Sequence, residues 1–100
     1  MSSLTNAQVR ELKARAQLMK PMLKIGHDGL SASFLAALDE ALKHHELVKV
    51  KFVDFKEQKK ELAPQLAENT GSELIMRVGN VAVLYRVKPP QEKTDEETGD

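Results

Sequence analysis

A four-residue turn bounded by glycines, Gly26-His27-Asp28-Gly29, has the residue types and spacing that point most directly to chemistry. It lies between a short apolar run, residues 22–25, and a helical pattern that opens at Ser31. Glycine adopts positive φ without strain and has no Cβ, so a ligand backbone can approach closely. The first amides of the following helix are unpaired and lie at its positive end. Strand, turn and helix in this order predict a phosphate-binding corner.

Basic side chains gather in the segment that leads into this turn. Within residues 1–25 the only acid is Glu11, and the bases are Arg10, Lys13, Arg15, Lys20 and Lys24. The chain has no formal net charge, because residues 89–100, with five acids and one lysine, carry −4 and residues 1–88 carry +4. This asymmetry favours a polyanionic partner for the body of the chain and a solvated acidic tail. The alternative is an ordinary solvated helix face.

The composition excludes several classes of protein. One hundred residues form one domain with a modest core and no room for a large enzyme cavity. Without cysteine, neither a disulfide framework nor a thiolate metal site is possible. The N-terminal residues lack the layout of a signal peptide, and no apolar run approaches membrane-spanning length. We therefore expect a soluble cytoplasmic protein with no membrane partner.

Apolar residues at helical spacing predict three helices, at residues 5–18, 32–45 and 55–69. Thr5 and Gln8 form a capping box for the first, and Ser31 is a plausible N-cap for the second. Pro64 interrupts the third pattern, which predicts a kink or a split near Lys60.

Four strands are predicted, at residues 22–25, 47–53, 73–78 and 81–86. The connection Gly79-Asn80 is short enough to imply an antiparallel hairpin. With the helices, this gives the order α-β-α-β-α-β-β. Strand–helix–strand units favour parallel pairing, so we expect an α/β (mixed α+β) fold, a single small domain at residues 1–88 with helices packed on a four-stranded mixed sheet. Residues 89–100 are expected to be a disordered acidic tail.

A family resemblance rests on motifs spread from about residue 4 to residue 87: Leu18-Met19-Lys20-Pro21, Lys24-Ile25-Gly26-His27-Asp28-Gly29-Leu30, His45-Glu46-Leu47-Val48-Lys49-Val50-Lys51, Asn69-Thr70-Gly71, Val78-Gly79 and Val83-Leu84-Tyr85-Arg86. The chain resembles the YhbY-like bacterial proteins, the stand-alone form of the CRM (chloroplast RNA splicing and ribosome maturation) domain. The resemblance implies a fold like the C-terminal domain of translation initiation factor three. It also implies RNA binding, through a GxxG turn like that with which KH-type domains hold single-stranded RNA.

Bacterial members look like factors that associate with the precursor of the large ribosomal subunit. The resemblance therefore implies a ribosome assembly factor whose partner is ribosomal RNA or a pre-50S particle. We expect it to act as a monomer without cofactor, metal or small-molecule substrate. It implies an RNA site made of Arg10, Lys13, Lys20, Lys24, Gly26, His27, Asp28 and Gly29. Asp28 departs from the basic or small polar residue that the family often places there. Its carboxylate weakens a phosphate contact unless it caps the next helix.

Several other residues have both a functional and a purely structural interpretation. His44-His45-Glu46 suggests a metal site, but adjacent helical residues do not share a face. The favoured role of the histidines is to interact with the negative C-terminal end of a helix. Tyr85 either stacks a base or packs in the core, and the core is favoured. Lys49 and Lys51 either touch RNA or lie in a solvated or helix-covered position, and the second is favoured because both are far in sequence from the turn.

No paired carboxylates, phosphate-binding loop of the nucleotide-hydrolase type or nucleophile elbow is present, so we do not expect an enzyme. Two functions stay open. The first is an RNA-binding protein, and the alternative is a protein–protein adaptor whose basic surface is incidental.

Overall fold

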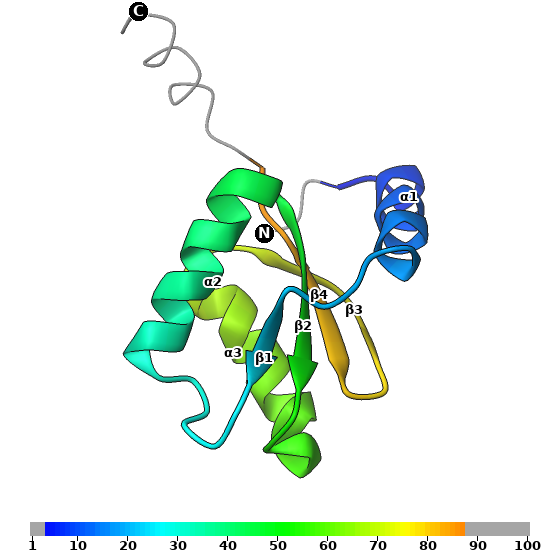
Figure 1. Cartoon of the computed structure of the whole chain (residues 1–100). Helices are drawn as coiled ribbons and strands as arrows, with labels where there is room; N and C mark the ends of the chain where they lie inside the picture. The colour runs from blue at the N-terminus through cyan, green and yellow to red at the C-terminus, as the bar shows by residue number, and fades with distance from the viewer. Residues whose placement is uncertain (1–3, 88–100) are drawn as a thin grey trace, which may run out of the picture.

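The order of elements in the computed structural model, which describes residues 4–87, is the predicted α-β-α-β-α-β-β (Figure 1). The elements are α1 (Asn6–Gln17), β1 (Leu23–Ile25), α2 (Ala32–His45), β2 (Leu47–Phe52), a 3₁₀ turn η1 (Lys56–Gln58), α3 (Lys59–Thr70), β3 (Glu73–Val78) and β4 (Val81–Tyr85). The acidic tail predicted for residues 89–100 lies outside the described residues.

The four strands form one mixed sheet in the order β1-β2-β4-β3. β1 and β2 are parallel, and β4 is antiparallel to both β2 and β3. The last strand of the described chain thus lies in the middle of the sheet, between two strands that precede it. The predicted mixed sheet with a final hairpin is confirmed.

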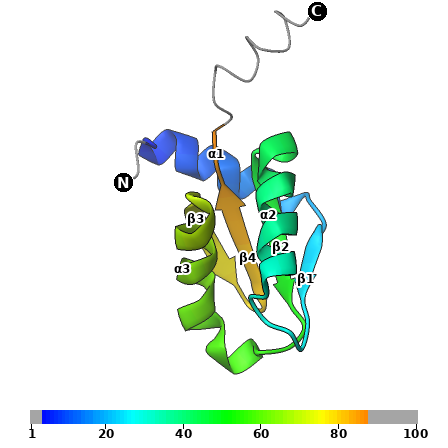
Figure 2. The same cartoon turned by 90° about the vertical axis from the view of Figure 1, so that its left-hand side faces the viewer.

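Helices cover both faces of this sheet (Figures 1 and 2). α2 and α3 lie on one face, over the larger core, which contains Ile25, Leu38, Leu42, Val48, Val50, Phe52, Ala63, Leu66, Ala82 and Leu84. α1 lies on the other face, over a smaller core of Leu12, Ala16, Leu47 and Val83. Period-two alternation along β2 and β4 sends neighbouring side chains to opposite cores. Tyr85 packs against the smaller core, as the core interpretation predicted.

Two polar arrangements fix α1. Its capping box is present: the Gln8 backbone N–H donates to the Thr5 hydroxyl, and the Thr5 backbone N–H donates to the Gln8 side chain. At the other end, the Lys49 ammonium donates to the carbonyls of Ala16 and Met19, each at 2.9 Å. Lys49 is therefore covered by a helix, as predicted, and it binds the negative end of that helix.

The third helical segment differs from its predicted bounds of 55–69. It divides at Gln58, where η1 gives way to α3, so the predicted split lies just before Lys60. Phe55 is not helical, because its backbone is left-handed, with φ of 59° and ψ of 33°. Pro64 lies inside α3 and lacks the N–H that would donate to the Lys60 carbonyl, which weakens the first turns of this helix.

Arg86, just after β4, ties three elements together. Its guanidinium donates to the Asp39 carboxylate and to the Thr70 carbonyl, both at 2.7 Å, and to the Asp39 carbonyl at 3.1 Å. We expect Arg86→Met to lower the free energy of unfolding by about 2 kcal/mol, because hydrogen bonds from a charged donor contribute more than neutral ones. Urea denaturation measures this. Arg10→Met, on the exposed face of α1, is the matched control, and an equal loss in both variants would contradict the role of Arg86.

Candidate functional site

The Gly26–Gly29 turn follows β1 at the edge of the sheet and is closed by a hydrogen bond from the Gly29 N–H to the Gly26 carbonyl, at 3.0 Å. Gly29 is buried and has a φ of +64°. Gly26 is exposed, lies outside the left-handed region, and has no atom within 4 Å of where a Cβ would be. Only Gly29 therefore needs the conformational freedom of glycine, whereas Gly26 leaves the surface open to a ligand.

The two central residues of the turn point into solvent. The His27 ring and the Asp28 carboxylate lie 3.3 Å apart, with side chains that are 90% and 77% exposed. Asp28 does not cap α2, because the Ser31 hydroxyl accepts the Phe34 N–H at 3.1 Å and fills that role. The carboxylate thus stays beside the turn, and any contact made there with phosphate depends on the backbone and on nearby cations.

One such cation pair comes from the parallel pairing of β1 and β2. The register places Lys24 opposite Lys51. Since their neighbours Ile25 and Phe52 point into the larger core, both lysines lie on the other face of the sheet. Both are exposed, and Lys24 also lines a shallow depression of about 290 Å³ with the turn and the start of α2. Sequence analysis omitted Lys51 from the site because of its distance along the chain.

The remaining predicted bases lie further from the turn. Arg10 and Lys13 are exposed on α1, and both views place this helix at the opposite end of the sheet from the turn (Figures 1 and 2). Lys20 is exposed in the connection that leads into β1, before its first residue. The structure thus brings Lys24 to the turn and keeps Arg10 and Lys13 apart from it.

The sequence of residues 4–86 matches the CRS1/YhbY (CRM) domain. The chain belongs to this family. It is 33% identical over 92 residues to a protein of Pseudomonas aeruginosa that is named a probable RNA-binding protein, and the match covers 91% of this chain and 88% of the relative. A similarly named protein of Bacillus subtilis is 32% identical over 84 residues, covering 83% of this chain and 88% of the relative.

The same CRM fold is found in a solved structure. The solution structure of the hypothetical protein SAV1595 from Staphylococcus aureus superposes with a TM-score of 0.74 at 34% identity, covering 90% of this chain and 95% of that one. The predicted family and fold are confirmed, and the prediction of a binding protein rather than an enzyme agrees with this family.

A residue that sequence analysis missed lies beside the turn of this CRM domain. Phe55 is in the connection after β2, where the N–H groups of Val53 and Asp54 both donate to the Ile25 carbonyl at 3.0 Å. A Cβ added to Gly29 would lie 3.3 Å from the Phe55 ring. The ring therefore packs on the turn, although the residue is 39% exposed. Sequence analysis missed Phe55 because it fits the helical pattern predicted for residues 55–69. The signal that could have found it is a large apolar residue just after a strand.

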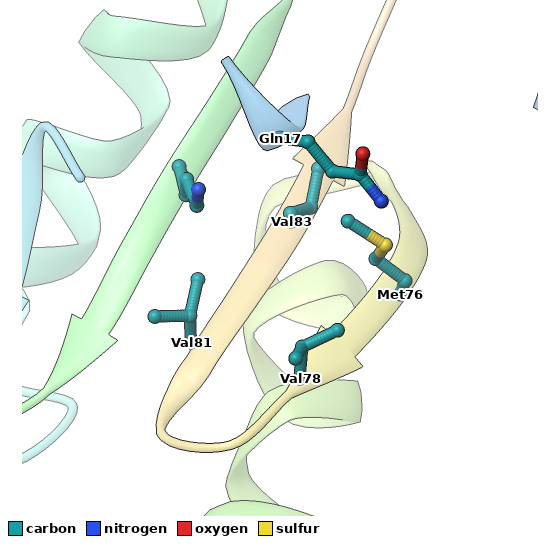
Figure 3. A pocket seen from close by; sticks show the side chains of 6 residues that line it. Gln17, Met76, Val78, Val81 and Val83 are labelled. Carbon is teal, nitrogen blue, oxygen red and sulfur yellow. The ribbon is translucent and has the colours of Figure 1, made fainter. Parts of the chain in front are cut away.

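A groove of about 230 Å³ lies on the α1 face of the sheet (Figure 3). It is lined by Gln17, Lys49, Met76, Val78, Val81 and Val83. Val81 is the β4 partner of Lys51 and Val78 is the β3 partner of Val81, so the groove continues the row that begins at Lys24 and Lys51. Val78 is 62% exposed, so this apolar side chain lies in solvent at the groove.

The described part of the chain offers little support for metal binding or membrane insertion. His44 lies in the last turn of α2, as predicted, with its ring 3.0 Å from the Glu40 carboxylate. Within residues 4–87, no group of three His, Asp or Glu side chains is arranged to hold a metal ion. Over the same range, no helix has the length and apolar character needed to cross a bilayer.

Proposed function

We propose that this CRM domain binds RNA, with the sugar-phosphate backbone seated on the Gly26–Gly29 turn and held by Lys24 and Lys51. The observation that carries the proposal is the β1–β2 register, which places the two exposed lysines opposite one another on neighbouring strands, just before the open Gly26. The relatives' names as probable RNA-binding proteins support the same assignment.

The physical basis is electrostatic. Gly26 allows phosphate oxygens close to the backbone, and the start of α2 presents the positive end of a helix beside the same depression. Two lysines neutralise phosphate charge and release counterions. Phosphate contacts carry no sequence information, so we expect binding with modest sequence preference.

The finer part of the proposal concerns the partner. The family resemblance points to ribosomal RNA in a precursor of the large ribosomal subunit, with the chain acting in the cytoplasm as a monomeric assembly factor and with residues 1–88 as the RNA-binding unit. The site residues then include the turn itself, Lys24 and, at the far end of β1, Lys20. Crosslinking to RNA in cells, followed by sequencing of the bound fragments, tests this partner directly.

RNA binding by the full chain should weaken steeply as salt rises. For single strands, the logarithm of affinity falls with the logarithm of salt concentration by about 0.7 per phosphate neutralised. A chain that ends at Lys88 should bind more tightly, because residues 89–100 carry a net charge of −4 that competes with phosphate. Fluorescence anisotropy with labelled RNA at several salt concentrations measures both effects. Absent binding at low salt, or binding that salt does not weaken, would contradict the proposal.

A protein–protein adaptor is the second candidate, and the groove beside Val78 is the observation that favours it. An apolar interface gives a shallow salt dependence, whereas phosphate contacts give a steep one. The same titration therefore separates the two functions, with a protein partner replacing RNA in one arm.

A further inference from the structure

We propose that Phe55 is a stacking platform for one unpaired base of the RNA that the glycine turn holds. This inference rests on the proposed RNA binding and names what that site does besides holding phosphate. The ligand chemistry is a planar nucleobase presented by a single-stranded segment. An aromatic ring accepts any base, since every base has a π face.

The backbone of Phe55 has a disfavoured, left-handed conformation, which suggests that the ring is placed there for binding. A bulky residue with φ of 59° is uncommon, and the left-handed conformation is disfavoured for residues with a Cβ. Such conformations persist where surrounding contacts hold them, and they gather at ligand sites. Here the contacts are the hydrogen bonds from Val53 and Asp54 to the Ile25 carbonyl and the bond from the Gln58 N–H to the Phe55 carbonyl, each at 3.0 Å.

The surroundings of the ring point the same way. Phe52 is fully buried, whereas Phe55 is 39% exposed and belongs to neither apolar core. Its ring lies against Gly29, where an added Cβ would be 3.3 Å from Cε2 and 3.5 Å from Cζ. One part of the ring thus supports the turn while another part remains open to solvent beside it.

The position suits a nucleotide. A phosphate on the turn leaves its neighbouring sugar and base to either side. The exposed ring of the turn itself is the His27 imidazole, which lies beside the Asp28 carboxylate. Phe55 supplies a larger, uncharged ring from the adjacent connection. Stacking does not depend on counterion release, so its contribution adds to the affinity without adding to the salt dependence.

The test compares the full chain with Phe55→Leu and Phe55→Trp. The probe is a set of short single-stranded RNAs with 2-aminopurine at each position in turn, and a matching set with an abasic nucleotide at each position. We expect Phe55→Leu to lower affinity by about tenfold and Phe55→Trp to retain it, with an unchanged salt slope in both. One 2-aminopurine should be quenched by the parent and less so by Phe55→Leu. An abasic nucleotide at that position should weaken the parent and leave Phe55→Leu unchanged.

Three results would overturn the inference. If Phe55→Leu weakens intact and abasic RNA equally, the ring only positions Gly29. If Phe55→Leu binds like the parent while the double change Lys24→Ala with Lys51→Ala weakens binding, RNA binding stands and the platform does not. If neither change affects binding, the proposed function fails together with the inference. Thermal unfolding by circular dichroism confirms that each variant is folded, and Phe55→Gly, which relieves the positive φ, supplies a second folded variant without the ring.

Discussion

Gly26→Asp should lower RNA affinity by more than tenfold, because it adds negative charge beside the phosphate. The thermal midpoint of unfolding should stay within a few degrees of the parent, because this position accepts a Cβ without strain. The turn has nothing within 4 Å of that Cβ, and Gly26 is outside the left-handed region. The loss of binding would therefore report on the ligand and not on the fold. Anisotropy titration and circular dichroism on the same samples measure the two quantities.

Gly26→Ala is the matched control for this substitution. It adds the Cβ without the charge, so a small loss would assign most of the aspartate effect to electrostatic repulsion, and a large one to close backbone approach. Gly29→Asp is a poorer test, because Gly29 has a φ of +64° and its Cβ would press on the Phe55 ring. If folded Gly26→Asp binds RNA like the parent, the segment is only a turn, and the adaptor becomes the better account.

The double change Lys24→Ala with Lys51→Ala should have the second large effect. We expect a loss of affinity at low salt and a salt slope reduced by about 0.7 for each phosphate contact removed from a single strand. Both side chains are exposed on the face opposite the larger core, so stability should change little. Anisotropy titrations over a range of salt concentrations give the slope, which a merely misfolded variant would not shift in this way.

Arg10→Ala with Lys13→Ala removes the same charge from α1 and is the comparison for that experiment. Sequence analysis placed these two residues in the RNA site, whereas the fold places α1 at the other end of the sheet from the turn. Equal losses in the two double variants would mean that RNA responds to the general basic field of the domain. A loss confined to the Lys24 and Lys51 variant would locate the contact.

Local signals in the sequence predicted most of the fold. Thr5 and Gln8, three residues apart, predicted a capping box that is present, and Ser31 caps the second helix as expected. The strand predicted at residues 47–53 is β2, which spans Leu47–Phe52. These features depend on neighbours within a few residues, which the chain displays directly.

The candidate site was predicted in part, because its other members meet through long-range pairing. Lys24 and Lys51 become neighbours only once the register of β1 against β2 is known, and a shift of one residue would have placed Lys51 in the core. Phe55 fitted a helical pattern and lies instead in a left-handed connection that packs on Gly29. Neither relation is visible in residue spacing along the chain.

The place of β4 in the sheet has a consequence for folding during synthesis of the protein. β2 and β3 are made before β4, and both need it as their common neighbour. Until Val81–Tyr85 has left the ribosome, β2 has one unpaired edge and β3 has no partner strand. The sheet therefore cannot be completed until synthesis has passed β4, and the edges of β2 and β3 that β4 later covers stay open to other strands until then.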